Sequence, residues 1–492
     1  MKKWRKLTAL LLVLSLVLAM GACSTTETSS TSSGGGTSES STTETSEPTS
    51  ETSEESSTTS ETSDTETEDT GADMTSYPRN ETLYQGGQQW GTPVSNNPMA
   101  ANPVYGAIAQ SDNARVLIWE TLSMWNVSDD TAYPLLAAGD YEWNEDQTAI
   151  TVPLKEVVHW SDGTPFTAAD VEATWDAHVN YQSTIGVAYS PYIADVVAVD
   201  DYTVEIQANT DNLNRMKVLE YLPKVYVMQK AYLDELAEAN GGDATAMKNE
   251  PMWDAPHTGP YSPKEQNDQK WVIERDDNYW GQDESMWGKL PVPKYIIHNI
   301  YSSNDVAAQA FANGEIDINQ SYTANIETFW EDQGLPISTY MQEPPYNAPG
   351  VIPSVIFNTQ RNGLDQAEVR KAIAMATDYD QIIESAMTGQ SPTFEEYPRT
   401  IFNWSEAQQS MILDPEALAP LQWEGNDVEG ANALLDEAGI VDPNGDGNRE
   451  YNGEELPFQV ACPTAWPYYE AVLQRTHAVA NNTGIPHALP HP

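Results

Sequence analysis

The sequence predicts an α/β fold for the part of the chain that follows residue 76. From Glu81 onward, short β-like runs alternate with helical runs, which is the pattern of an α/β protein. The length of 492 residues leaves room for two or three domains with sizeable cores. With only two Cys, the chain is neither a disulfide scaffold nor a Cys-ligated zinc or iron–sulfur protein.

Local patterns predict individual strands and helix starts. The predicted strands span 82–84, leading into Gly86, then 148–152 and 204–206. Helices are predicted where a side chain that accepts backbone N–H bonds precedes a run with helical spacing. These starts are Thr167 with Asp170, Asp365 with Glu368, and Asp378, whose helix is expected to stop near Gly389.

The first 22 residues are predicted to be a secretory signal. Basic residues precede an apolar run over 7–20, and small residues follow it directly before Cys23. The run is too short for a permanent membrane span. The segment 20–23 resembles the lipobox of bacterial lipoproteins, which implies that Cys23 is lipidated and becomes the mature N-terminus. Cys462 is then the remaining thiol, expected to be a small buried hydrophobe.

Residues 23–76 are predicted to be the lipidated Cys followed by a disordered linker. Residues 24–73 contain 31 Ser or Thr and 13 Asp or Glu, with no base and no large apolar side chain. Such a segment cannot bury enough surface to offset the entropy of ordering. We expect a tether that holds the folded part away from a membrane; a glycosylated stalk stays open as an additional role.

The charge balance excludes one class of partner. The chain carries 74 acidic and 23 basic residues, a formal net charge of −51. Such a surface repels nucleic-acid phosphate, so a DNA- or RNA-binding role is not expected.

The signal and the lipobox together predict a protein anchored on the outer face of the cytoplasmic membrane of a Gram-positive bacterium.

One segment, 159–171, carries a long specific pattern. It reads His-Trp-Ser-Asp-Gly-Thr-Pro-Phe-Thr-Ala-Ala-Asp-Val and resembles the signature of the family 5 solute-binding proteins of ABC importers. Physically, Ser161-Asp162-Gly163 forms a tight turn, Pro165 orders the exit and Thr167 caps a helix. We therefore expect these residues to shape the fold and not to contact a ligand.

Further blocks follow in the order that this family shows. They lie at 133–137, 257–261, 277–281, 311–317, and 357–359 together with 369–372 and 376–378. The resemblance runs from about residue 81 to about residue 485. It implies a two-lobed periplasmic-binding-protein-like α/β fold of the class II type with an extra small domain. A ligand is held between the lobes, which close around it by a hinge motion.

The resemblance also implies a division into two lobes, and the sequence departs from the family pattern near residue 485. Residues 77–300 are expected to form the first lobe with its inserted subdomain, and residues 301–492 the second lobe. Three Pro fall within 485–492, where the resemblance leads us to expect a strand. The second lobe and the return of the chain to the first lobe are therefore expected to be incomplete.

The ligand class stays open between oligopeptides and short oligosaccharides. The chain has 15 Trp, many beside turns, and indole faces stack on sugar rings and on aromatic side chains alike. The seven His are scattered, which disfavours nickel. The predicted ligand-binding residues are Trp90, Trp125, Asn358, Trp466 and Tyr468.

The resemblance implies a monomeric receptor without enzymatic activity, cofactor or metal, working with ABC permease subunits. A secreted carbohydrate-active enzyme is the alternative, because such enzymes also combine Ser/Thr-rich linkers with Trp-rich clefts. The segment 442–448 is similar to the first half of a calcium loop, but position twelve is Gly453. We expect a structural turn there.

Overall fold

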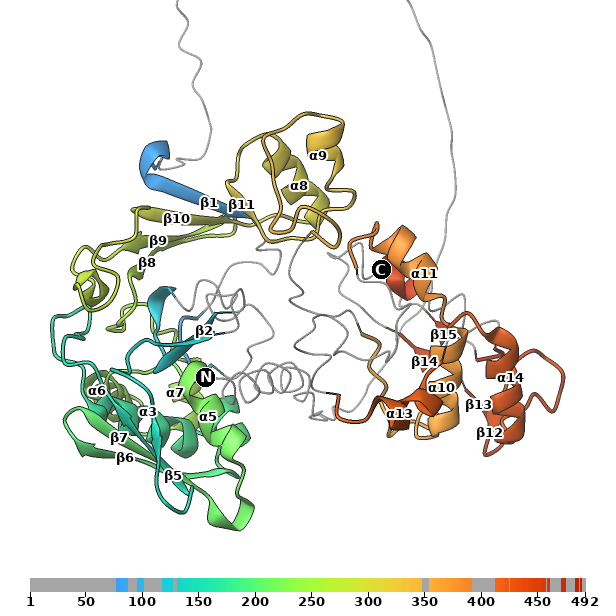
Figure 1. The fold of residues 1–492 in the computed structure, drawn as a ribbon, viewed down its shortest axis with the longest axis horizontal. Coiled ribbons are helices and arrows are strands. Elements are labelled where there is room, and N and C mark those ends of the chain that lie inside the picture. The colour runs from blue at the N-terminus through green and yellow to red at the C-terminus, as the bar shows by residue number, and fades with distance from the viewer. Residues whose placement is uncertain are drawn as a thin grey trace, which may run out of the picture.

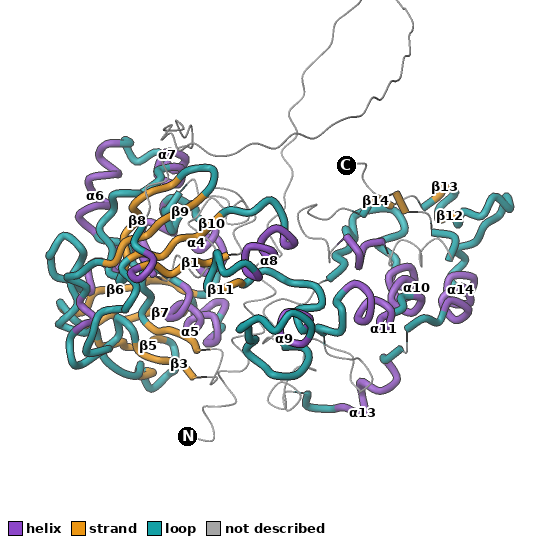
Figure 2. Tube along the Cα trace, turned by 90° about the horizontal axis from the view of Figure 1, so that it is seen from above, coloured by secondary structure: helices purple, strands orange, loops and turns teal. Residues whose placement is uncertain are grey.

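The described residues build two hydrophobic cores. The computed structural model describes residues 77–86, 95–100, 117–126, 131–346, 354–391, 412–423, 425–456, 458–460, 470–474, 483–485 and 487–488. One core draws on residues between Met99 and Ile296, and the other on residues between Leu364 and Ile485. We call the parts around them the first and the second lobe. In both views, α8 and α9 lie between the sheets of the first lobe and the helices of the second (Figures 1 and 2).

The first lobe contains a four-stranded antiparallel sheet. Its order is β4-β5-β7-β6, with bounds Glu142–Trp143, Ala149–Pro153, Thr203–Ala208 and Ile193–Asp200. Strand β7 alternates between the core and the surface: Val204, Ile206 and Ala208 are buried and the residues between them are not. The strands predicted at 148–152 and 204–206 are thus confirmed.

Helix α3, Ala168–Asn180, packs on this sheet and begins where the sequence predicts. The Asp170 carboxylate accepts from the N–H of Thr167 at 2.9 Å, the reciprocal bond of a capping box. It also accepts from the N–H of Lys230 at 2.8 Å and from the indole N–H of Trp160 at 3.3 Å. Asp170 therefore ties the signature segment to the start of α6, and its burial raises its pKa.

The rest of the signature forms the predicted turn. Gly163 has φ +84°, a conformation that favours glycine, and its N–H donates to the carbonyl of Trp160 at 2.8 Å. Asp162 accepts from the Thr164 N–H at 2.9 Å and from the Gln229 side chain at 2.9 Å. The signature residues thus serve local structure, as expected.

Among the other helices of the first lobe, α4 and α6 pack against α3, and α5 contacts β7. These other helices are α4 (Thr184–Tyr189), α5 (Arg215–Lys224), α6 (Lys230–Ala239), α7 (Ala244–Asn249) and the 3₁₀ turns η1 (Arg79–Glu81), η2 (Thr210–Asn212) and η3 (Trp280–Gln282). On α5, Lys217 and Glu220 form a buried ion pair at 2.6 Å. Among the described residues, no helix is long and apolar enough to cross a membrane.

A mixed five-stranded sheet completes the first lobe. Its order is β11-β1-β10-β9-β8, with bounds Ile318–Asn319, Thr82–Gly86, Tyr295–Asn299, Lys270–Arg275 and Tyr261–Gln266. Strand β1 is central and pairs in parallel with β10 and β11. Helix α8, Asn304–Ala312, connects the two. The sheet therefore includes residues beyond the boundary predicted at residue 300.

A short hairpin lies at the margin of the first lobe that faces the second (Figure 1). Strand β2, Ser123–Asn126, pairs antiparallel with β3, Thr131–Pro134. Met124 is opposite Tyr133, and Trp125 is opposite Ala132. Met124 packs against the core of the first lobe. Because neighbouring residues of a strand point to opposite faces, Trp125 points away from that core.

The second lobe is built on helices. Its elements are α10 (Ala367–Ala376), α11 (Tyr379–Gln381), the π-helical turn η4 (Ile382–Ala386), α13 (Pro415–Leu418), the 3₁₀ turn η5 (Ala419–Leu421) and α14 (Val428–Glu437). The short helix α9 (Thr328–Glu331) precedes them and lies between the lobes (Figure 1). Helices α10 and α14 pack together through the buried Val369, Ile373 and Leu435.

The helix starts in this lobe were predicted only in part. Asp378 caps α11 and accepts from the Gln381 N–H at 3.0 Å, and the chain leaves the helical region at Gly389 with φ +73°, as predicted. The predicted cap Asp365 is wrong, because α10 begins after Gln366, whose side chain makes no cap bond. Arg361 and Gly363 already accept the N–H groups of Asp365 and Gln366 in a preceding turn.

Short strand pairs close the second lobe. Strands β12 (Glu450–Tyr451) and β13 (Glu454–Glu455) pair antiparallel, and β14 (Phe458–Gln459) pairs in parallel with β15 (His487–Ala488). The expectation that the prolines of 485–492 prevent a strand is therefore wrong for residues 487–488. The three Pro flank this two-residue strand and do not occupy it.

Candidate functional site

Three parallel strands bring their carboxyl ends to one edge of the five-stranded sheet. Strands β10, β1 and β11 run in the same direction and end at Asn299, Gly86 and Asn319. In open α/β sheets, ligands bind outside the carboxyl ends of the strands. We call the side chains at 85–86, 299–301 and 318–323 the carboxyl edge, and this edge is the candidate site.

The carboxyl edge is held together by amide and hydroxyl groups. The Gln85 side-chain amide donates to the Gln320 carbonyl oxygen at 3.2 Å. Asn319 donates to the Thr323 hydroxyl at 3.1 Å, and Asn299 donates to the Tyr301 hydroxyl at 3.3 Å. These bonds fix the side chains that the three strands present.

Gly86 and Asp317 set the spacing of the edge. A Cβ atom on Gly86 would lie 2.5 Å from Cδ1 of Ile316 and 3.2 Å from Oδ1 of Asn319, so a larger residue here would require these side chains to move. Asp317 accepts from the Tyr84 N–H at 2.9 Å and pairs with the Arg79 guanidinium. Burial alone would raise the pKa of Asp317, but these hydrogen bonds lower it. Its charge is therefore compensated within the first lobe.

The chain runs from the carboxyl edge directly into a contact with the second lobe. The Tyr322 hydroxyl lies 3.0 Å from the Thr388 hydroxyl, which also accepts from the Asn325 N–H at 3.0 Å. The Gln390 side chain donates to the Thr323 carbonyl at 2.7 Å. We call these five residues the interlobe node. It joins the segment after β11 to the segment after the π-helical turn η4.

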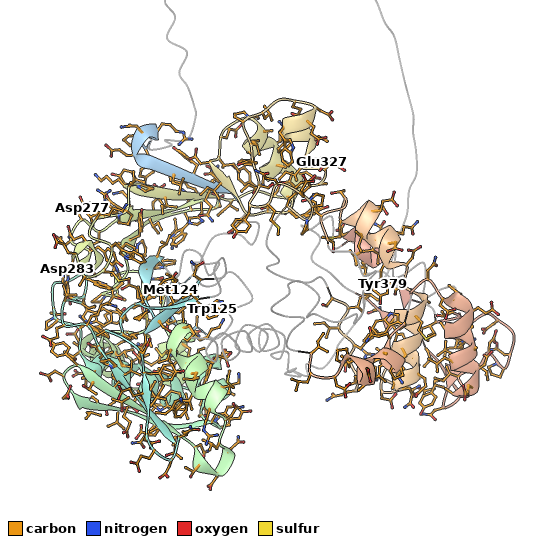
Figure 3. All side chains as sticks on the ribbon, in the orientation of Figure 1. Met124, Trp125, Asp277, Asp283, Glu327 and Tyr379 are labelled. Atoms are coloured by element: carbon orange, nitrogen blue, oxygen red, sulfur yellow. The ribbon has the colours of Figure 1, made fainter. Side chains whose placement is uncertain are left out.

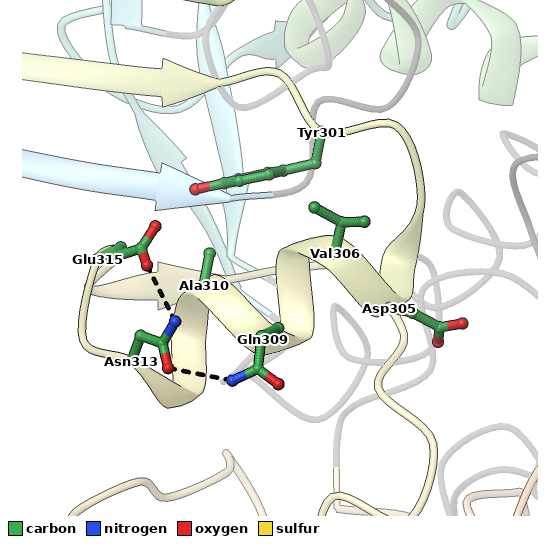
Figure 4. Close-up of a pocket in the computed structure, with 7 residues that line it drawn as sticks. All are labelled: Tyr301, Asp305, Val306, Gln309, Ala310, Asn313 and Glu315. Carbon is green, nitrogen blue, oxygen red and sulfur yellow. Dashed lines mark hydrogen bonds between the residues drawn. The ribbon is translucent and has the colours of Figure 1, made fainter. Parts of the chain in front are cut away.

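A hollow of about 370 Å³ opens beside the carboxyl edge. Tyr301 lies across it above Val306 and Ala310 of α8, and its hydroxyl end points toward the side that holds Asn313 and Glu315 (Figure 4). Gln309 and Asp305 complete the lining. Gln309 donates to Asn313, which donates to Glu315, both at 3.0 Å. The hollow thus combines an aromatic ring, an apolar floor and a polar rim.

Of the predicted ligand-binding residues, Trp125 and Asn358 lie in the described part of the chain. Trp125 sits on the hairpin at the margin of the first lobe facing the second (Figure 3). Its Nε1 is buried and has no hydrogen-bond partner. By contrast, the indole N–H groups of Trp119 and Trp280 have buried oxygen acceptors at 2.8 Å. A buried donor without an acceptor requires an explanation.

Asn358 is exposed, and its side-chain oxygen accepts from the Gln360 N–H at 3.1 Å. This bond is a local turn contact, and the described part of the chain contains no hydrogen bond that links Asn358 to Trp125. Trp90, Trp466 and Tyr468 lie outside the described residues.

The carboxyl edge itself was not predicted from the sequence. Its residues are uncharged polar side chains, two tyrosines, two isoleucines and a glycine, which carry no motif. One signal was available: the run 318–326 has nine residues and no Asp, Glu, Lys or Arg, in a chain with a net charge of −51. This uncharged run directly follows the segment 311–317.

The described residues contain no group of three or more His, Cys, Asp or Glu side chains placed to hold a metal ion. The calcium-like segment is a turn, as expected. Asp442 accepts from the N–H groups of Gly445 at 2.7 Å and Gly447 at 2.8 Å. These backbone bonds lower the pKa of Asp442. Its two oxygens are therefore used within the turn.

The fold has clear relatives among solved structures. The mannohexaose-bound periplasmic oligopeptide-binding protein of an ABC transporter from Thermotoga maritima has a TM-score of 0.70 and 24% identity, covering 85% of this chain and 73% of that one. NikZ from Campylobacter jejuni, solved with Ni(L-His), has a TM-score of 0.61 and 16% identity, covering 84% and 74%. The fold is thus the two-lobed α/β fold of the extracytoplasmic binding proteins.

Sequence comparison is more specific. Residues 131–486 match the bacterial extracellular solute-binding proteins, family 5, so the chain belongs to this family. It is 24% identical over 359 residues to the nickel-binding periplasmic protein of Escherichia coli and 23% identical over 324 residues to the oligopeptide-binding protein OppA of Bacillus subtilis. These alignments cover 71% and 61% of this chain, and 60% and 53% of the relatives' own length.

Proposed function

We propose that this chain is the substrate-binding component of an ABC importer and captures a peptide or a short oligosaccharide. The ligand binds between the lobes, which close around it by a hinge motion. The closed monomeric receptor then delivers the ligand to the permease subunits. No bond of the ligand is made or broken, so the protein is not an enzyme. A ligand that touches both lobes only in the closed state shifts the population toward that state.

The observation that carries this proposal is the continuity of the carboxyl edge with the interlobe node. The segment after β11 provides Asn319 to the edge and, a few residues later, Tyr322 and Asn325 to the contact with Thr388. A ligand on this edge is therefore next to the place where the two lobes meet. Family membership supports the same reading.

Trp125 supports the position of the site on the first lobe. Its indole points away from the core and its buried N–H has no acceptor. We propose that a ligand oxygen accepts this N–H when the lobes close. Trp90, Asn358, Trp466 and Tyr468 stay predicted ligand contacts.

We expect Trp125→Ala to weaken ligand binding by about 10- to 100-fold, because a stacked aromatic contact is worth about 1–3 kcal/mol. Trp125→Phe should keep part of the stacking and lose the N–H bond, so its affinity should be intermediate. The measurement is isothermal titration. Trp287→Ala is the matched control, because Trp287 is 49% exposed and donates to Tyr279 within the first lobe. Equal affinity of Trp125→Ala and the parent would remove Trp125 from the site.

The function itself is tested by a thermal-shift panel on the purified chain. The panel contains di- to hexapeptides and neutral di- to hexasaccharides, because a bound ligand raises the unfolding midpoint by mass action. We expect a shift with one class, and a smaller radius of gyration in solution scattering when that ligand is present. Release of products from a labelled saccharide would instead support the enzyme. No shift with either class would contradict the proposal.

The anchoring is a separate part of the proposal. The lipobox-like segment before Cys23 and the acidic linker after it support a lipoprotein on the outer face of the cytoplasmic membrane. We expect the protein in the membrane fraction, and Cys23→Ser in the medium. Metabolic labelling with palmitate measures the difference: labelled Cys23→Ser protein would exclude Cys23 as the lipidation site.

A further inference from the structure

We propose that the carboxyl edge selects an uncharged, hydroxyl-rich ligand, so that the chain takes up a neutral oligosaccharide in preference to a peptide. This inference rests on the proposed function and narrows it to one ligand class. Three features of the structure support it: the absence of charge at the edge, the lining of the hollow and the unpartnered indole N–H of Trp125.

The carboxyl edge lacks charged side chains although the chain as a whole is strongly acidic. Residues 85–86, 299–301 and 318–326 contain no Asp, Glu, Lys or Arg. The neighbouring Asp317 is compensated by Arg79. His298, next to Asn299, is buried and its pKa is lowered to about 4, so it is neutral at pH 7. The edge therefore offers hydrogen bonds without a net charge.

A free peptide is poorly matched to such an edge. The edge has no cation for the α-carboxylate, the carboxylates of Asp305 and Glu315 in the adjoining hollow repel it, and a charge that loses water without a counter-charge is strongly disfavoured. A sugar hydroxyl is donor and acceptor at once, and it pairs equally well with the amides of Gln85, Asn299 and Asn319 or the hydroxyl of Thr323. The chemistry of the edge therefore favours the sugar.

The hollow beside the edge has the surface chemistry that a sugar ring requires. Sugar rings have apolar C–H faces and hydroxyls around the rim. The hollow has the complementary arrangement: the ring of Tyr301 and the apolar side chains of Val306 and Ala310, with amides and carboxylates at its margin (Figure 4). Its volume of about 370 Å³ lies in the range of small-molecule sites. Glu315 already accepts from Asn313, which leaves acceptor capacity for a hydroxyl.

The hairpin of β2 and β3 adds an aromatic contact and a hydrogen-bond donor. Trp125 presents a ring face together with an N–H donor that has no acceptor. A hydroxyl or ring oxygen of a sugar stacked on an adjacent surface supplies an acceptor at the ring edge. The indole of Trp125 on the hairpin and the phenol of Tyr301 after β10 then provide two aromatic contacts for one oligosaccharide.

The test compares three probes on the purified chain by isothermal titration: neutral tetrasaccharides with mannosyl or glucosyl units, tetra-alanine, and the same peptide with acetylated and amidated ends. We expect a tetrasaccharide to bind at least 100-fold more tightly than either peptide. Its affinity should change less than twofold between 50 and 500 mM NaCl, because no charged group is recognised. Tighter binding of either peptide would overturn this inference and leave the proposed function standing. Binding of none of the probes would overturn both.

Two variants locate the site. Tyr301→Ala should weaken tetrasaccharide binding by about 10-fold or more, whereas Tyr301→Phe keeps the ring and should lose less than threefold. Tyr192→Ala, between α4 and β6, is the matched control. The unfolding midpoints of the ligand-free variants separate a binding role from a structural one. Equal affinities of Tyr301→Ala and Tyr192→Ala for the tetrasaccharide, at equal unfolding midpoints, would exclude the hollow as part of the binding site.

Discussion

Replacing Glu120 with alanine is expected to lower the free energy of unfolding by about 3–5 kcal/mol, as for other buried groups whose removal leaves polar partners unpaired. Glu120 is 2% exposed. Its two oxygens accept from the Tyr279 hydroxyl at 2.6 Å and from the Trp280 indole N–H at 2.8 Å. The substitution leaves both donors buried without an acceptor and opens a cavity between them.

The measurement is urea-induced unfolding of the ligand-free chain. Glu120→Gln is the informative second variant, because glutamine has the same shape but only one side-chain acceptor. Its NH₂ group then faces one of the two donors, the Tyr279 hydroxyl or the Trp280 indole N–H. We expect it to cost about 1–3 kcal/mol, the penalty of one unsatisfied buried group. A loss below 1 kcal/mol for Glu120→Ala would mean that this network does not hold the first lobe together.

Glu120 also makes stability depend on pH in a defined direction. Burial raises its pKa from 4.5 to about 7, despite the hydrogen bonds from Tyr279 and Trp280 and the nearby Lys155. The folded state therefore binds the proton more tightly than the unfolded state. The contribution of this group is fully present below about pH 4.5 and is lost as the pH rises toward and through 7. Glu120→Gln removes this dependence.

Three buried histidines give stability the opposite dependence on pH. Burial lowers the pKa of His178, His257 and His298 from 6.5 to about 4. Their contribution is present above about pH 6.5 and is lost as the pH falls through 4. The difference in unfolding midpoint between the parent and Glu120→Gln should therefore shrink from pH 5 to pH 8, while both proteins lose stability below pH 6. A difference that stays constant would contradict the assignment of the titration to Glu120.

Arg449→Met is expected to have a comparable effect on the second lobe, lowering its free energy of unfolding by about 3–5 kcal/mol. Arg449 is 9% exposed and donates to the Thr483 carbonyl and the Asn432 side-chain oxygen, both at 2.8 Å, and to the Ile440 carbonyl. These bonds join α14, the turn before β12 and the segment 483–485. Methionine fills the volume but leaves the acceptors unpaired.

The ion pair of Arg449 contributes less to the free energy of unfolding than its buried hydrogen bonds. The partner Asp436 lies at 2.6 Å, but its side chain is 63% exposed, and exposed pairs contribute about 0–1 kcal/mol. Asp436→Asn is therefore the matched control, and we expect it to lose less than about 1 kcal/mol. Urea unfolding followed by near-ultraviolet circular dichroism compares the two. If both variants lost the same amount, the ion pair and not the buried carbonyl bonds would be the source of stability.

Much of the local structure could be predicted because its causes are local. The turn at Gly163, the reciprocal bond between Thr167 and Asp170 and the cap at Asp378 each depend on residues three or four positions apart. Even so, Asp365 and Glu368 match a cap pattern that the structure does not use, because the preceding turn ends only at Gln366. Local patterns thus predicted that a helix exists better than where it begins.

The candidate site depends on contacts that no local pattern contains. The carboxyl edge exists because β1 is inserted between β10 and β11, and the node exists because Thr388 meets Tyr322 and Asn325. Trp125 could be singled out as an aromatic residue beside a turn, but its unpartnered N–H depends on what surrounds it in space. The family resemblance supplied the two-lobed fold, and the residues at the edge follow from the sheet order.

The central position of β1 has a consequence for the order in which the first lobe folds. Thr82 pairs with Tyr295 and Gln85 with Ile318, so β1 finds its neighbours only after more than two hundred further residues have been synthesised. The four-stranded sheet needs only residues between 142 and 208 and can form early. Non-local pairing of this kind slows folding, and it leaves strand edges unpaired in the meantime. The carboxyl edge is therefore among the last parts of the first lobe to assemble, and the uncompleted edge of β1 stays open to other strands until then.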